Sequence, residues 1–137
     1  MADLSIGTVV NLNPIVKTAG IAGETLTAGQ SVYYKISDGR WYKAQATTLA
    51  LSGYGTQVGI CLVGGTVGTA VTIATSGDVD LGVSVTVGTI YVISAANAGG
   101  IAPWADLAST NLVTILGVGN AADIISMGVF ASGIAHA

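Results

Sequence analysis

Ser31-Val-Tyr-Tyr-Lys-Ile36, Ser37-Asp-Gly-Arg40 and Trp41-Tyr-Lys-Ala-Gln45 follow one another without a break. Two runs rich in aromatic and β-branched residues flank an Asp-Gly pair, and glycine supplies the positive φ that a tight turn between antiparallel strands requires. The segment therefore predicts a β-hairpin.

Aromatic residues lie on both faces of this hairpin, because side chains alternate along a strand. Tyr33 and Trp41 are expected to alternate with Tyr34 and Tyr42. A hairpin that is aromatic on both faces is either buried twice or has one face against a partner. Both alternatives remain open from the sequence.

The pattern continues along the chain of 137 residues, in which twenty glycines separate short runs of Val, Ile, Thr and Tyr. Glycine disfavours long helices, whereas these runs favour strands. We predict an all-β fold, a small barrel or sandwich, with further strands and at most single helical turns. The predicted strands cover residues 57–62, 70–75, 83–87, 89–94, 111–118 and 124–130, and the turns fall at 44–51 and 102–109.

Residues 1–26 read differently, because Asn11-Leu-Asn-Pro14 and two X-Gly pairs interrupt any strand pattern. We expect an extended N-terminal arm there, ordered mainly by a neighbour, and a single β-rich domain over 27–137. No signal peptide is expected, since the first residues lack a basic and an apolar region.

Charge is scarce: 8% of the residues are Asp, Glu, Lys or Arg, against about a quarter in an ordinary soluble domain. Beyond Lys43 the only charged residues are four aspartates. Four dispersed basic residues do not form the cluster that nucleic acid requires, and glycine or polar residues interrupt every apolar run before it could span a membrane as a helix. We expect neither partner.

Groups for catalysis are few. Cys61, the single cysteine, lies in an apolar run and is expected to be a buried small hydrophobe, as suits a reducing cytosol. Asp78 and Asp80 could hold Ca²⁺ or act as paired acids, but a solvated turn is the favoured interpretation. His136 lies next to the last residue. We predict no catalytic residue, no metal, no cofactor and no enzymatic activity.

A family resemblance is visible in several segments of the sequence. These are residues 24–33 with 38–42 in the hairpin region, Ala74-Thr-Ser-Gly-Asp78, Thr86–Ser94, Gly99–Leu107 and Val113–Val118. These strings resemble small head decoration (cement) proteins of tailed bacteriophages, over roughly residues 24–120. The resemblance implies a β-rich homotrimer on the outer capsid surface that bridges major capsid protein subunits, after synthesis in the bacterial host cytoplasm.

A surface for the capsid or for sister subunits would then be needed. Loop tryptophans are good anchors in interfaces, and an N-terminal arm could add a strand to a neighbour. The expected contact residues are Leu4, Ile6, Val9, Tyr33, Trp41 and Trp104. Two alternatives remain: a head-fibre or tail component, and a carbohydrate-binding module with Trp41, Trp104 and Tyr54 as stacking platforms.

Overall fold

The computed structural model describes residues 3–136, with the backbone alone for residues 11–15. These residues form nine β-strands and one turn of 3₁₀ helix, so the all-β prediction is confirmed. The elements are β1 (Val10–Ile21), β2 (Ser31–Lys35), β3 (Arg40–Lys43), β4 (Val58–Val63), β5 (Ala70–Asp80), β6 (Ile90–Ile93), β7 (Ile101–Pro103), η1 (Trp104–Asp106), β8 (Leu112–Ala121) and β9 (Ile124–Ala135).

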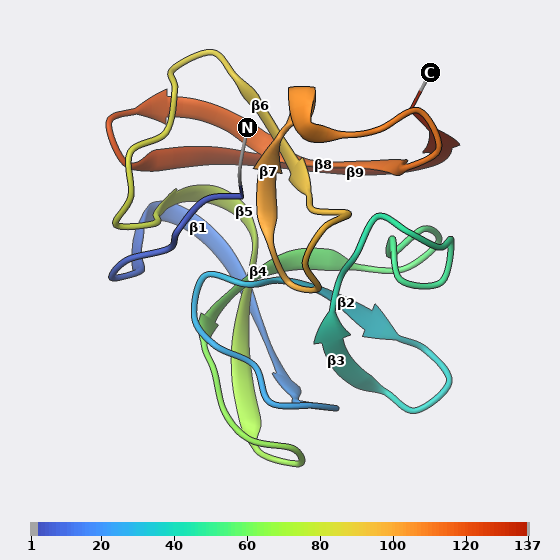
Figure 1. The fold of residues 1–137 in the computed structure, drawn as a ribbon. Helices are drawn as coiled ribbons and strands as arrows, with labels where there is room; N and C mark the ends of the chain where they lie inside the picture. Colours follow the sequence, from blue (N-terminus) through green and yellow to red (C-terminus); the bar gives the residue numbers. More distant parts are fainter. Residues whose placement is uncertain (1–2, 137) are drawn as a thin grey trace.

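One curled antiparallel sheet in the order β3-β2-β4-β5-β9-β8-β6-β7 forms a half-barrel (Figure 1). Strand β5 is its branch point. Residues 72–74 of β5 pair with β4, whereas residues 76–80 pair with β9 on the same side. Strand β1 pairs with the opposite side of β5 along both halves. The strands β4 and β9 therefore separate at Thr75.

The hairpin predicted from Asp38-Gly39 is present as β2 and β3. Gly39 has a φ of 69°, and its N–H donates to the Lys35 carbonyl at 2.9 Å. The backbone N–H of Arg40 donates to the Asp38 carboxylate at 3.2 Å. An aspartate that accepts a backbone N–H two residues on is the usual side-chain device for closing such a turn.

The register sets the two aromatic faces differently from the expected alternation. Tyr33 lies opposite Tyr42, and Tyr34 lies opposite Trp41, so each of these pairs shares one face. Tyr33 packs into the larger core, which the strands β4 to β9 and the loop segments between them line, whereas Trp41 packs into a smaller core with Val32, Cys61 and Ile73. Both aromatic faces of the hairpin therefore pack against cores of the same chain.

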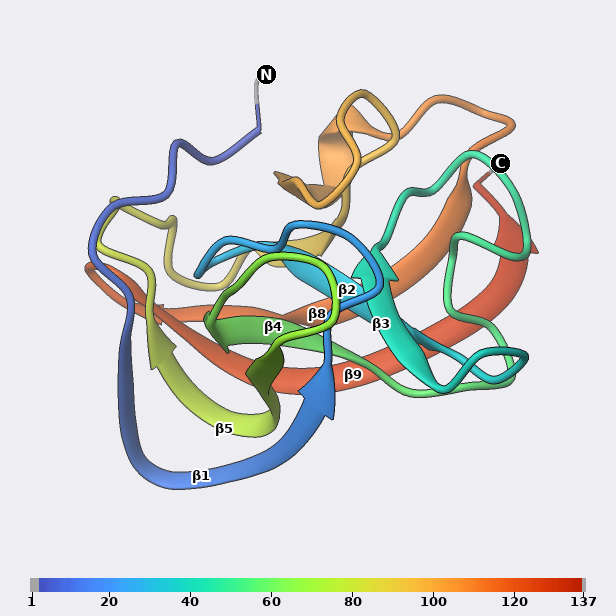
Figure 2. The same ribbon diagram turned by 90° about the horizontal axis from the view of Figure 1, so that it is seen from below.

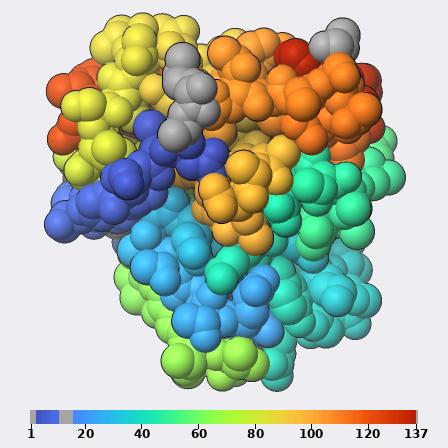
Figure 3. Space-filling view, in the orientation of Figure 1, coloured from blue at the N-terminus to red at the C-terminus, as the bar shows by residue number. Residues whose placement is uncertain are grey.

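The N-terminal residues are part of the same body, which differs from the expected arm. Strand β1 pairs with β5 from Val10–Asp80 to Ile21–Ala70. Ahead of it, the backbone N–H of Leu4 donates to the Ile101 carbonyl at 2.8 Å. In the space-filling view this segment lies against the hairpin of β6 and β7 (Figure 3). Residues 3–26 are therefore ordered by contacts within their own chain.

The glycines that suggested a loose arm have a packing role instead. A Cβ at Gly20 would overlap the indole of Trp41, and a Cβ at Gly23 would overlap the ring of Tyr42. The N–H of Gly23 also donates to the Trp41 carbonyl at 2.8 Å. The end of β1 and the chain directly after it can therefore close against β3 only because these two positions have no side chain.

Two further expectations differ from the structure. Residues 83–87 form no strand, although Val85 is buried in the larger core. Residues 44–51 form turns rather than a helix. Among the described residues no helix reaches the length and hydrophobicity that crossing a membrane requires.

Candidate interaction surface

The chemistry of Cys61 agrees with a structural role. Its side chain is fully buried in the smaller core, and burial raises the pKa of the thiol to about 11. A nucleophilic cysteine needs the opposite, because only the thiolate attacks. Cys61 is thus held as a neutral hydrophobe.

The other candidates for chemistry are dispersed. Asp78 and Asp80 lie within β5, where the predicted turn is replaced by a continuing strand. His136 packs edge-on against Trp104, with 5.0 Å between the ring centroids. In residues 3–136 no three His, Cys, Asp or Glu side chains come close enough together to bind a metal ion.

The predicted contact residues fall into three environments. Leu4, Ile6 and Val9 are half-buried and pack against the larger core. Tyr33 and Trp41 are 6% and 2% exposed. The expectation that these two side chains contact a partner does not fit their burial, because the core of their own protomer already covers them.

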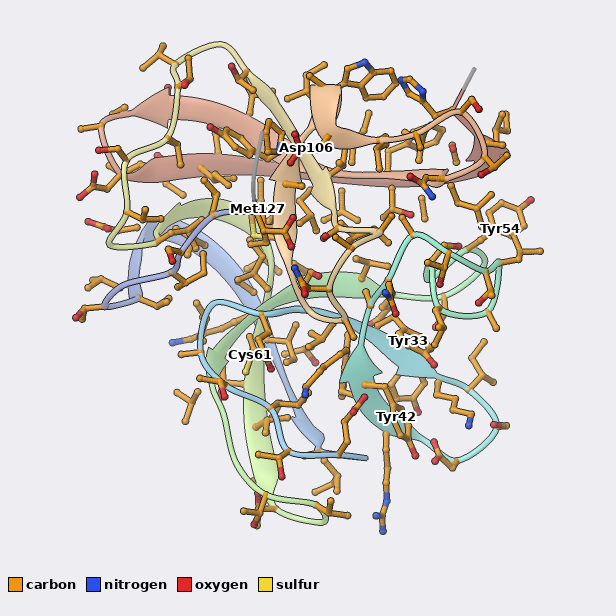
Figure 4. The ribbon with its side chains drawn as sticks, in the orientation of Figure 1. Tyr33, Tyr42, Tyr54, Cys61, Asp106 and Met127 are labelled. Carbon is orange, nitrogen blue, oxygen red and sulfur yellow. The ribbon has the colours of Figure 1, made fainter. Side chains whose placement is uncertain are left out.

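Trp104 is the one predicted contact residue with a large exposed side chain. It stands in η1, directly after β7, and is 39% exposed. Tyr54, from the loop between β3 and β4, is 55% exposed and lies at the periphery, apart from Tyr33 and Tyr42 (Figure 4). With Trp41 buried, the three proposed stacking platforms for a sugar do not form one surface.

Large apolar side chains are exposed at many points of the surface. Among the described residues fourteen large hydrophobic side chains are exposed, in a chain with eleven charged residues. Isolated exposed hydrophobes are ordinary, but an extended apolar surface with little charge is typical of an interface. The most exposed are Val16, Ile36, Val63, Val87, Phe130 and Ile134.

Three of the four basic residues lie in the β2–β3 hairpin. Lys35 lies over the ring of Tyr42, 5.1 Å from its centroid, and the Tyr42 hydroxyl donates to the Asp38 carboxylate. This hydrogen bond, with smaller contributions from Lys35 and other neighbours, lowers the pKa of Asp38. The Glu24 carboxylate accepts from the backbone N–H of Lys43 at 2.9 Å. The open side of β3 is therefore partly closed by a side chain.

A groove of about 400 Å³ lies where β4 and β9 separate. It runs between β1, the start of β4 and β9, and Thr75 and Val129 are among the residues that line it. Val16, 60% exposed, lines the same groove. Lys17 lines it as well. Sequence reasoning missed this groove, because its lining comes from four segments that are distant in the sequence.

Comparison of the chain with protein-family models, curated proteins and solved structures finds no match.

Proposed function

We propose that this chain is a structural protein of a tailed bacteriophage virion, which binds the outside of the capsid and stabilises it as a cement or decoration protein. It acts as a homotrimer, has no enzymatic activity, and its partner is the major capsid protein. The resemblance of the hairpin and of the strings that follow it supports this assignment.

One structural observation carries the proposal: the apolar, charge-poor surface of the folded protomer. Burial of apolar surface at an interface contributes roughly 25 cal/mol per Å² to the free energy of association. Salt weakens this apolar contribution to binding little, because screening acts on charges. A protein that holds neighbouring subunits together needs contact area and not a reactive group, and several attachments per oligomer raise the avidity beyond that of any one contact.

The continuity of the sheet supports the same function. A capsid under internal pressure strains the joints between its subunits, and a rigid body that spans a joint opposes this strain. The single sheet that joins all the strands of the described residues supports such a role.

Co-sedimentation with expanded heads that lack this protein tests the proposal. We expect saturable binding, and we expect decorated heads to release DNA at a higher temperature than bare heads. An unrelated β-protein of similar size serves as the control. Absence of binding to expanded heads would contradict the proposed function.

A further inference from the structure

We propose that the groove between β1, β4 and β9 binds an extended segment of the major capsid protein, and that Lys17 pairs there with an Asp or Glu side chain of that segment. This inference rests on the proposed function and names one surface through which the protein holds the capsid.

The groove exists because β5 is irregular at Thr75. On one side of β5, pairing with β4 ends at Ala74 and pairing with β9 begins at Ser76. On the other side, the register with β1 skips Thr75 between Val16 and Lys17, which marks a β-bulge. Among residues 3–136 Thr75 therefore has no strand partner on either side. A bulge bends its strand, and Figure 2 shows β5 strongly curved, with β1 along its outer side.

The size and the neutral lining of the groove suit a peptide. Its volume of about 400 Å³ lies in the range of ligand pockets in proteins, roughly 300–1,000 Å³. Three of its eight lining residues are valine, and four are threonine or glutamine. The valines offer apolar contact, and the neutral polar side chains offer hydrogen bonds to a peptide backbone.

Two of the threonine hydroxyls are held in place by the backbone. The Thr56 hydroxyl donates to the Tyr34 carbonyl at 2.7 Å, and the Thr75 hydroxyl donates to the Val16 carbonyl at 3.3 Å. Each oxygen keeps lone pairs, so it can still accept a backbone N–H of a bound segment.

Charge indicates what the bound segment carries. Lys17 is the eighth lining residue, and none of the described residues that line the groove is acidic. Lys17 is also the only basic residue of the chain outside the β2–β3 hairpin. An uncharged segment would cover the ammonium group without a counter-charge, which costs free energy. A segment with one carboxylate removes this cost, and salt screens such an enclosed pair less than an exposed one.

The engagement of the chain's own carboxylates favours the capsid protein over a second copy as the source of this segment. Four of the seven acidic side chains already accept a hydrogen bond within their own protomer: Asp3, Glu24, Asp38 and Asp80. A carboxylate of a different protein needs no such rearrangement to meet Lys17.

Charge reversal at Lys17 tests the inference. Lys17 is exposed, so Lys17→Glu should keep the fold, which circular dichroism checks. We expect its affinity for expanded heads, measured by co-sedimentation, to fall about tenfold or more, because like charges across an interface oppose binding. Lys17→Arg retains the charge and should restore the affinity that Lys17→Glu loses. Lys35→Glu is the matched control: it makes the same change of net charge at an exposed residue outside the groove, and should stay within about threefold of wild type.

Carbodiimide coupling of decorated heads identifies the partner of Lys17. The reagent joins a lysine amine to an adjoining carboxylate as an amide, and the carbodiimide takes up the water that is lost. After digestion, mass spectrometry should find Lys17 joined to an Asp or Glu of the major capsid protein.

Three results would overturn the inference and leave the proposed function in place. One is a Lys17→Glu variant that binds heads as wild type does. The second is an equal loss for Lys17→Glu and Lys35→Glu, which would assign the effect to net charge. The third is Lys17 joined to a second copy of this chain, which would assign the groove to the oligomer. Wild type that does not bind heads would instead contradict the proposed function and the inference together.

Discussion

Trp41 and Trp104 have opposite environments, although both are tryptophans that the sequence singles out. Trp41 fills the smaller core and is 2% exposed, whereas Trp104 is 39% exposed. We expect Trp41→Ala to lower the free energy of unfolding by about 3–5 kcal/mol, because it leaves a large cavity. Trp104→Ala should cost about 1 kcal/mol or less. Urea unfolding followed by circular dichroism measures both, and equal losses would contradict the assignment of Trp41 to the core.

The Cys61 thiol makes stability depend on pH. Its pKa is about 11 in the folded chain against 9.0 for the unperturbed group, so folding favours the neutral thiol. This contribution is complete below pH 9 and is lost as the pH rises from 9 towards 11. It amounts to at most about 3 kcal/mol.

Cys61→Ala separates this effect from the titration of lysines and tyrosines. The difference in unfolding free energy between wild type and Cys61→Ala, measured in urea at pH 8 and at pH 10.5, should shrink by about 2 kcal/mol. A difference that stays constant would show that the thiol is not desolvated.

Strand β1 belongs to the sheet, so its removal should unfold the protein rather than release an arm. Deletion of residues 2–20 exposes the whole outer side of β5, which also borders the smaller core. We expect loss of the cooperative thermal transition, measured by circular dichroism. A truncated chain that melts as wild type would restore the interpretation of an independent arm.

The elements most accurately predicted are those whose residues carry a local signal. Asp38-Gly39 determines its own turn, and the hairpin follows from it. Strand β1 was missed because Pro14 indicates a break, and because Gly20 resembles a flexible position. The need for glycine there comes from Trp41, which is distant in sequence, and no local pattern contains this contact.

The candidate surface was less predictable than the fold. The uncharged run over residues 124–135 is visible in the sequence, but the same pattern is equally consistent with a strand buried in the core. Strand β9 loses its pairing with β5 beyond Gly128, because β5 pairs with β4 over one half and with β9 over the other. This change of partner along β5 depends on the whole sheet, and so does the groove beside Thr75.

At the scale of the whole molecule, scarcity of charge predicts how association responds to salt. Only 8% of the residues are charged, so ion pairs contribute little to the free energy of association. Salt at 0.1 M screens charges beyond about 10 Å, and this screening therefore removes little of that free energy. We expect its affinity for expanded heads to change by less than about threefold between 50 mM and 1 M sodium chloride. Sulfate should strengthen binding, since it favours apolar burial. Co-sedimentation across both salt series measures this, and a loss of tenfold or more in sodium chloride would indicate that the charged hairpin around Lys35 and Arg40, and not the apolar surface, holds the protein to its partner.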